Sequence, residues 1–148
     1  MIPNIEILLN SVLHSAPYGI MTFAAKRDDK NKINDFEFLT VNKAAQAMVN
    51  HSAEELIGST LLKKLPTNKE VGLFDKYCHV VETGDILSLD QHYKGEELDS
   101  WFRIKAEKLE DGFVVSFIDI TEFKSRTKEL ERSEARYRKL FFESMDAI

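Results

Sequence analysis

WFRIKAEKLEDGFVVSFIDIT, residues 101–121, is the stretch that decides the fold. Apolar and charged residues alternate from Phe102 to Glu107, which is the two-residue period of a half-buried strand. Asp111-Gly112 follows, and this pair predicts a tight hairpin turn because it tolerates positive φ values. The uncharged run from Phe113 to Ile118 is β-branched and aromatic, which is typical of a central strand. The stretch therefore predicts two strands joined by a tight turn.

A helix is expected directly after the second strand. Asp119, followed three residues later by Glu122, has the spacing of a capping box, so the helix should begin within one or two residues of Ile120. A central strand that continues into a long charged helix couples the sheet to whatever lies downstream. This arrangement suits a signalling module.

The composition fits one globular domain with an appendage: the chain has 148 residues, of which 43% are hydrophobic. The net charge of −5 is unevenly placed, because residues 121–148 carry seven basic and six acidic side chains, which leaves −6 on residues 1–120. An acidic body argues against nucleic acid or an anionic membrane as the main partner. Neither a nucleic-acid partner nor direct membrane insertion is expected.

Cysteine usage and the N-terminus limit the class further. Cys78 is the single cysteine, which excludes an internal disulfide and a cysteine-rich zinc site. The apolar residues of positions 2–13 are interrupted by Asn4, Glu6 and Asn10, and no basic segment precedes them, so neither a signal peptide nor a membrane span is predicted. A cytoplasmic location is therefore expected.

The rest of the chain alternates between strand and helix signals. Pro3 to His14 has apolar residues at helical spacing, with one face packed on its own domain or turned to a second subunit. Strands are predicted at 20–26, 33–41 and 86–93, and helices from Asn42, from Ser52 and over 70–83. The core order is thus β-β-α-α-α-β-β-β, an α+β arrangement of five strands.

Several short motifs, in this order and spacing, resemble the successive signatures of a PAS domain. They are VNKAA at 41–45, SAEELIG at 52–58, VVETGD at 80–85, Trp101, and DIT at 119–121. The resemblance covers about Val12 to Thr121. It implies a five-stranded antiparallel sheet in spatial order 2-1-5-4-3, with helices on one face. It also implies a flanking helix at 1–15, a core at 16–120 and a signalling helix at 121–148.

The resemblance implies a sensory and dimerisation module that regulates an output domain in the same polypeptide, such as the histidine kinase of a two-component system or a diguanylate cyclase. Asp119, Ile120 and Thr121 are then the residues expected to relay the signal. No catalytic motif occurs in the sequence, so the chain itself is not expected to be an enzyme. The alternatives are a haem or flavin sensor and a ligand-free dimerisation spacer.

Prosthetic groups fit the sequence poorly. In haem-binding relatives the axial histidine lies at the position of Leu73, and His79 follows about one and a half turns too late. The Asn-Cys-Arg-Phe run of flavin-binding relatives is absent. The four histidines lie on different elements, so no metal site is expected. No cofactor is predicted, and an unidentified small ligand remains open. The candidates to line a pocket are Phe74, Cys78, Trp101 and Phe117.

The tail carries a partial heptad pattern. Its two core positions fall on Ile120, Thr127, Glu134 and Phe141, and on Phe123, Leu130, Tyr137 and Ser144. Half of these residues are apolar, which predicts a marginal coiled coil or a solvated helix with paired charges. A homodimer is expected, because two apolar stripes need partners. They are formed by Ile5, Leu9 and Val12, and by Phe123, Leu130 and Tyr137.

The end of the chain is similar to its beginning. Leu9, Val12, Leu13, Gly19 and Ile20, displaced by 128 positions, fall on Tyr137, Leu140, Phe141, Ala147 and Ile148. The segment from Tyr137 onward therefore resembles the entry to a second PAS domain, and an output domain is expected beyond it.

Overall fold

The computed structural model describes residues 4–146, and the side chains of residues 4–142. Its elements, in chain order, are α1 (Ile5–Ser15), β1 (Gly19–Arg27), β2 (Ile33–Val41), α2 (Lys43–Val49), α3 (Ala53–Leu56), α4 (Leu61–Lys64), α5 (Thr67–Glu70), α6 (Leu73–Thr83), β3 (Leu87–Gly95), β4 (Leu98–Lys108), β5 (Gly112–Asp119) and α7 (Thr121–Asp146). Pro3, Ala147 and Ile148 lie outside the described residues.

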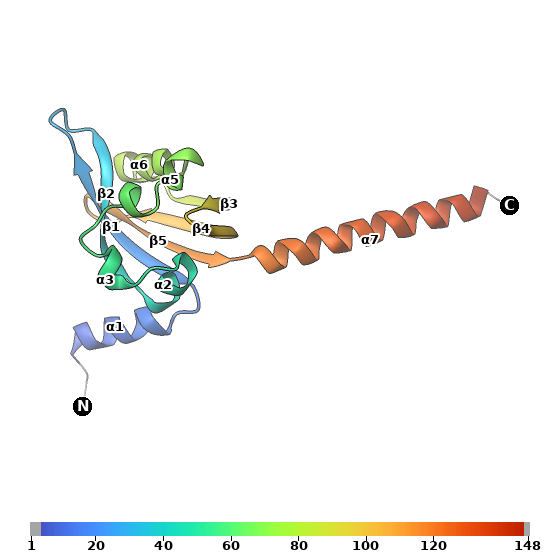
Figure 1. The fold of residues 1–148 in the computed structure, drawn as a ribbon, viewed down its shortest axis with the longest axis horizontal. Helices are drawn as coiled ribbons and strands as arrows, with labels where there is room; N and C mark the ends of the chain where they lie inside the picture. Colours follow the sequence, from blue (N-terminus) through green and yellow to red (C-terminus); the bar gives the residue numbers. More distant parts are fainter. Residues whose placement is uncertain (1–3, 147–148) are drawn as a thin grey trace.

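The five strands form one antiparallel sheet in the order β2-β1-β5-β4-β3, which confirms the predicted fold class. β5 is central, as its uncharged sequence predicts. Helices α2 to α6 lie over one face of the sheet, and α7 projects away from the body (Figure 1). The helices cover the face that carries Phe102, Ile104 and Ala106, and these residues are buried.

The turn between β4 and β5 differs from the prediction. The hairpin forms, but the positive φ belongs to Glu110 (51°), and not to Asp111 or Gly112. Gly112 is required for another reason: a Cβ there would overlap with the carbonyl oxygen of Phe23 on the neighbouring strand β1. The glycine therefore permits close strand approach.

Aromatic rings fill the core between the sheet and α6. The ring of Phe113 stacks on Phe23 at 4.8 Å and on Tyr77 of α6 at 4.4 Å between centroids, and it meets Phe36 edge-on at 4.9 Å. Each buried ring contributes about 1.5–3 kcal/mol of hydrophobic stabilisation. Phe113 thus fixes α6 against the centre of the sheet.

Asn42 ties the end of α1 to the sheet. Its side-chain oxygen accepts from the backbone N–H of Ile20 and, as the predicted N-cap of α2, from that of Ala45, both at 2.9 Å. Its amide nitrogen donates to the carbonyl oxygens of Leu13 (2.7 Å) and Tyr18 (3.1 Å). A buried amide with four partners has no unsatisfied group, so it anchors this corner at little desolvation cost.

The short helices follow the predicted caps in part. The capping box of Ser52 and Glu55 opens α3, as predicted. Two further single turns, α4 and α5, were not predicted. The helix expected from Glu70 begins instead at Leu73, because Gly72 adopts a left-handed φ of 83° and interrupts it.

The segment after α3 runs beside the edge strand β2. The N–H of Phe38 donates to the carbonyl oxygen of Ser59 at 3.0 Å, and the N–H of Gly58 donates to the carbonyl oxygen of Phe38 at 3.2 Å. Glu37 and Thr60 form an isolated antiparallel bridge. The outer hydrogen-bonding groups in the middle of β2 are therefore occupied.

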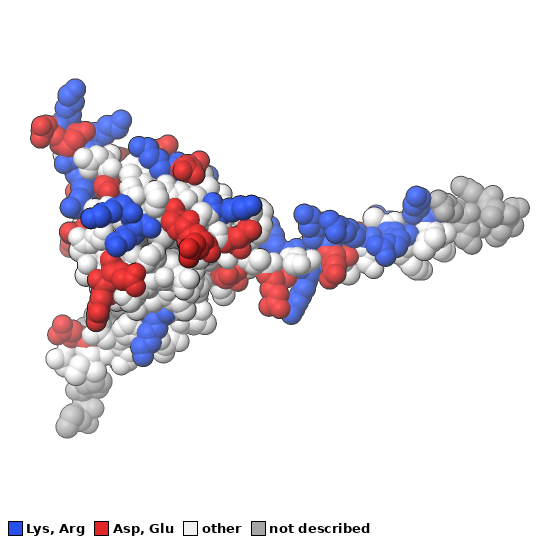
Figure 2. Space-filling view, viewed as in Figure 1, with Lys and Arg blue, Asp and Glu red and all other residues white. Residues whose placement is uncertain are grey.

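The two terminal helices are exposed. None of the residues of α1 is buried, and Ile120 is the last buried residue before α7 continues into solvent. Acidic and basic side chains are interspersed over the face shown and along α7 (Figure 2). Among residues 4–146, no helix combines the length and apolar character needed to cross a membrane.

Candidate functional site

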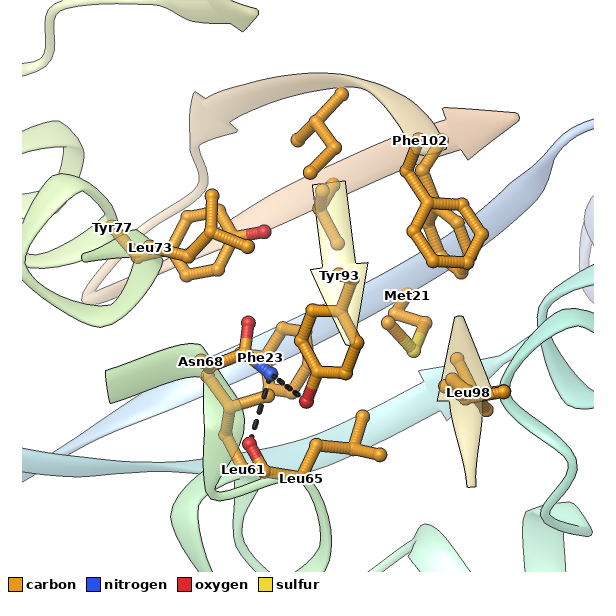
Figure 3. A pocket seen from close by; sticks show the side chains of 14 residues that line it. Met21, Phe23, Leu61, Leu65, Asn68, Leu73, Tyr77, Tyr93, Leu98 and Phe102 are labelled. Atoms are coloured by element: carbon orange, nitrogen blue, oxygen red, sulfur yellow. Dashed lines mark hydrogen bonds between the residues drawn. The ribbon is translucent and has the colours of Figure 1, made fainter. Parts of the chain in front are cut away.

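A cavity of about 40 Å³ lies between the helix-covered face of the sheet and the short helices (Figure 3). Both the sheet and the helices that cover it contribute side chains to its wall. The lining residues are Met21, Phe23, Val49, Leu61, Leu65, Asn68, Leu73, Tyr77, Tyr93, Leu98, Phe102, Ile104, Val115 and Phe117. The wall is therefore apolar, apart from one amide and two phenol groups.

The polar groups of the wall are held by hydrogen bonds. The amide nitrogen of Asn68 donates to the carbonyl oxygen of Leu65 at 3.0 Å and to the hydroxyl of Tyr93 at 3.3 Å (Figure 3). The Tyr93 hydroxyl donates in turn to the carboxylate of Glu96. Burial raises the pKa of Tyr93 and of Tyr77 above the ordinary value, so both phenols are neutral at physiological pH.

The cavity does not fit a haem or a flavin. Pockets for ligands of that size occupy roughly 300–1,000 Å³, whereas the space here suffices for a few water molecules. Leu73, which the family resemblance matches to the axial histidine of haem-binding relatives, lines the cavity, and the exposed His79 pairs with Asp85 at 3.1 Å. Among residues 4–142, no group of three metal-ligating side chains occurs.

The structure places only one of the four predicted pocket residues on the cavity wall. Phe117 lines it, while Phe74 is buried against Phe36 at 5.6 Å between ring centroids. Cys78 is half-buried beside the core, where desolvation, with smaller contributions from Asp75 and Glu82, raises its pKa to about 11. Such a thiol is protonated and unreactive at neutral pH.

Trp101 lies on the opposite, outer face of the sheet. Its ring stacks on that of His92 of β3, with 5.2 Å between centroids. The prediction that it faces the cavity was therefore wrong. The alternation along β4 could have predicted this position. Side chains two positions apart point to the same face of a strand, so Trp101 lies on the face of the exposed Arg103 and Lys105, and not on that of Phe102.

The polar residues of the cavity were missed in the sequence. Tyr93 lies on the inner face of β3, while Asn68 and Glu96 come from segments with no regular period. The contacts of Asn68 with Tyr93 and of Thr67 with Glu96 join residues 25–29 positions apart in the chain, and no local pattern signals such contacts.

Trp101 belongs instead to the junction between the sheet and α7. Its carbonyl oxygen accepts from the N–H of Ile120 at 2.8 Å, and its N–H donates to the hydroxyl oxygen of Thr121 at 2.9 Å. The carboxylate of Asp119 accepts from the N–H of Thr121 at 2.9 Å and from its hydroxyl at 2.5 Å. Ile120 and Thr121 thus contact one backbone position of β4, and Asp119 is joined to it through Thr121.

The predicted capping box at this junction forms only in part. Asp119 accepts from one backbone N–H, while the carboxylate of Glu122 accepts from Arg126 at 3.2 Å. A single residue, Ile120, connects β5 to α7, and its side chain is buried. The helix is therefore held at its first turn by side-chain and backbone contacts to β4.

Charged side chains reinforce this first turn on the outer face. The ammonium of Lys124 lies 4.9 Å from the ring centroid of Trp101 and 3.6 Å from the carboxylate of Asp90. Arg103 donates to the same carboxylate at 3.0 Å, which, with a smaller contribution from Lys124, holds the pKa of Asp90 below its ordinary value. All three side chains are partly exposed, so solvent screens each pair and its contribution to stability is small.

The residues predicted to form a dimer are exposed in the single chain. Ile5, Leu9 and Val12 lie on α1, and Phe123, Leu130 and Tyr137 lie on α7. The guanidinium of Arg103 lies 5.9 Å from the ring centroid of Phe123, at the base of α7. Pairing between two chains through these residues stays a prediction.

The comparisons with known proteins agree with this architecture. A family model described as the PAS fold matches residues 34–125. No curated protein matches the chain. Many solved structures share the fold, among them an RNA-binding light-oxygen-voltage receptor, with 15% identity and a TM-score of 0.65. The match covers 93% of this chain and 40% of that receptor, so this chain spans less than half of the receptor's length.

Two single domains are similar over most of their length. A domain of a sensory box sensor histidine kinase/response regulator from Geobacter sulfurreducens has 15% identity and a TM-score of 0.56, covering 76% of this chain and 90% of the domain. The PAS domain of Bordetella pertussis BvgS has the same identity and TM-score, covering 88% of this chain and 99% of that domain. At these identities the similarity concerns the fold alone.

Proposed function

Because this chain belongs to the PAS family, whose members are sensory modules, we propose that it passes a signal through α7 to an output domain in the same polypeptide. The output domain is a regulated enzyme such as a histidine kinase or a diguanylate cyclase. The signal is a small ligand or a contact with a partner. The catalytic activity belongs to the output domain, and the receptor acts in the cytoplasm.

The observation that carries this proposal is the junction of Trp101 with Ile120 and Thr121. Both backbone hydrogen-bonding groups of Trp101 in β4 are used, one by Ile120 and one by Thr121, the first residue of α7. A displacement of β4 relative to β5 therefore moves the start of the helix. Since a helix is stiff along its axis, a change at its first turn reaches its far end.

The dimeric arrangement is part of the proposal. Residues 1–15 flank the domain, residues 16–120 form the sensory core, and residues 121–148 lead as a coiled-coil helix into a second PAS domain. Exposed apolar side chains on α1 and α7 support an association of two chains. A marginal coiled coil is suited to switching, because a small input can shift its population.

An in-frame fusion to a kinase core tests the proposal. Residues 1–146 would replace the sensor of a histidine kinase, and one to seven residues would be inserted after Arg132 within α7. Relay through a coiled coil predicts that autophosphorylation varies with the insertion and recovers near seven residues. Activity that is independent of the insertion length would refute the relay and favour a passive spacer.

A further inference from the structure

The carboxylate of Glu96 joins the turn between β3 and β4 to the one-turn helix α5. It accepts from the N–H of Thr67 at 2.9 Å and from the Thr67 hydroxyl at 2.6 Å. It also accepts from the hydroxyl of Tyr93. Thr67 and Tyr93 are buried, so these hydrogen bonds are shielded from water. We call this set of contacts the Glu96 latch.

The latch crosses a seam in the cavity wall. Leu65 and Asn68 line the cavity on the α5 side of the seam, and Tyr93 and Leu98 line it on the strand side. The hydrogen bond from Asn68 to Tyr93 is the second contact across the seam. Separation of α5 from the turn would therefore expose the interior of the cavity.

The backbone of the turn is strained where the latch is attached. Glu96 and Glu97 both adopt a left-handed φ, 48° and 66°, a conformation that favours glycine or asparagine in such hairpins. A non-glycine residue in this conformation is strained, and it persists only where the surroundings hold it. The three hydrogen bonds of the Glu96 carboxylate supply that restraint.

The α5 segment is built to move as a unit. Its backbone hydrogen bonds are local, from Lys69 to Pro66 and from Val71 to Thr67, and the N–H of Asn68 donates to the carbonyl oxygen of Leu65 just before Pro66. The N-cap residue Pro66 provides no side-chain cap, and Gly72 ends the segment with a φ of 83°. The segment thus has a defined break at each end and little regular structure that resists its release.

We propose that α5 is a lid on the cavity and that the Glu96 latch holds it closed. When the latch opens, α5 swings about Pro66 and Gly72, and solvent or a small molecule gains access between Asn68 and Tyr93. This proposal depends only on the contacts between α5 and the turn, and not on the proposed relay through α7.

Matched variants distinguish the loss of the Glu96 latch from a loss of overall stability. Glu96→Ala removes the carboxylate, whereas Glu97→Ala changes an exposed residue of the same turn with the same φ class and leaves the contacts to α5 intact. Gly95→Ala is a second way to separate α5 from the turn, because the added Cβ would overlap with the hydroxyl of Thr67. The φ of Gly95 is not positive, so the alanine causes no backbone strain of its own. Glu96→Gln keeps an acceptor for Thr67, so it remains informative if Glu96→Ala does not fold.

Hydrogen exchange and thiol labelling provide the two readouts. In the Leu65→Cys background, methyl methanethiosulfonate reports access to the cavity wall, and the unreactive thiol of Cys78 is the negative reference in the same chain. We expect Glu96→Ala and Gly95→Ala to raise exchange over residues 67–72 and labelling of the new thiol at least tenfold. Glu96→Gln should give an intermediate rise, and Glu97→Ala should match the parent.

Hydrogen exchange in β1 and β5 decides whether the opening is local to α5 or extends to the whole domain. If it stays unchanged in the latch variants, the opening is local and the lid is supported. If it rises as much as exchange in α5, or if α5 does not respond, or if Glu97→Ala behaves like Glu96→Ala, the lid is refuted. Asp119→Ala is expected to leave exchange over residues 67–72 unchanged, which keeps this test separate from that of the relay.

Discussion

The hydroxyl oxygen of Thr121 accepts a hydrogen bond from the backbone N–H of Trp101 while its proton is donated to Asp119. One side chain at the start of α7 thus joins a strand N–H to a helix-capping carboxylate. The position of α7 relative to β4 depends on this group, since Ile120 alone separates strand from helix.

Asp119→Ala should loosen the start of α7 and leave the sheet intact. The change removes the acceptor of the Thr121 N–H and hydroxyl, with an expected cost of about 1 kcal/mol in local helix stability. Hydrogen exchange should become faster over residues 120–124, with β1 and β5 protected as before. Thr127→Val, farther along α7, is the control. Loosening of the whole domain would instead make Asp119 a determinant of the fold.

The chain should form a homodimer at micromolar concentration. Leu9→Glu on α1 and Leu130→Glu on α7 place a charge in one of the two exposed apolar stripes, so each should shift the equilibrium toward monomer. Leu39→Glu, an exposed residue of β2 outside both stripes, should not. Light scattering measures the mass, and a monomeric parent with both helices formed would contradict the prediction.

The purified chain should absorb only in the aromatic band. The cavity is too small for a haem or flavin, and its lining includes Leu73 but no histidine. An absorption spectrum after gel filtration checks this directly. A Soret or flavin band that stays with the protein would show that the cavity expands to hold the group.

Gly112→Ala should prevent folding or destabilise the domain by about 2–3 kcal/mol or more. The added methyl group would overlap with the carbonyl oxygen of Phe23, and backbone cannot yield as a flexible side chain can. Gly84→Ala is the matched control, because its Cβ meets no atom within 4 Å. Its φ of 80° strains an alanine at this position, and this strain is the whole expected cost, about 1–2 kcal/mol. Urea denaturation distinguishes the two variants.

Arg27→Gln should destabilise the protein at neutral pH and less so in acid. Arg27 donates to Asp111 at 2.8 Å and to Glu82 at 2.9 Å, and the hydrogen bond to Asp111 holds the pKa of that carboxyl below its ordinary value. A carboxyl group with a lowered folded-state pKa contributes stability that is present above its unfolded pKa, about 3.9, and is lost as the pH falls through the folded value.

The difference in urea midpoint between parent and Arg27→Gln should therefore shrink below about pH 4. Arg126→Gln, which removes an exposed pair with Glu122 on α7, is the control and should change the midpoint little. A constant difference between pH 2.5 and pH 7 would show that the stabilisation by Arg27 comes from packing and not from its charge.

Local signals predicted the elements well where one residue type decides the structure. Ser52 and Glu55 form the expected capping box, and Asn42 caps α2. The strand order came with the family resemblance rather than from the residues themselves. Asp111-Gly112 predicted the hairpin but not its turn, because the need for Gly112 arises from β1, a strand nearly ninety positions earlier in the chain.

The cavity was less accessible to prediction than the junction. Asp119, Ile120 and Thr121 are adjacent in the sequence, so their meeting with β4 requires only the hairpin. Glu96 contacts Thr67 across 29 residues, and the single turn α5 is too short for a periodic signal. The residues that form the cavity wall could therefore be identified only from the folded structure.

Residues 58–60, which run alongside β2, affect how the protein behaves at high concentration. Exposed edge strands are the usual starting points of aggregation and fibril growth, because their free N–H and C=O groups recruit another chain. On β2 the groups of Phe38 are already paired with Gly58 and Ser59. An incoming strand would first have to displace this segment, so self-association by strand addition is obstructed at that edge.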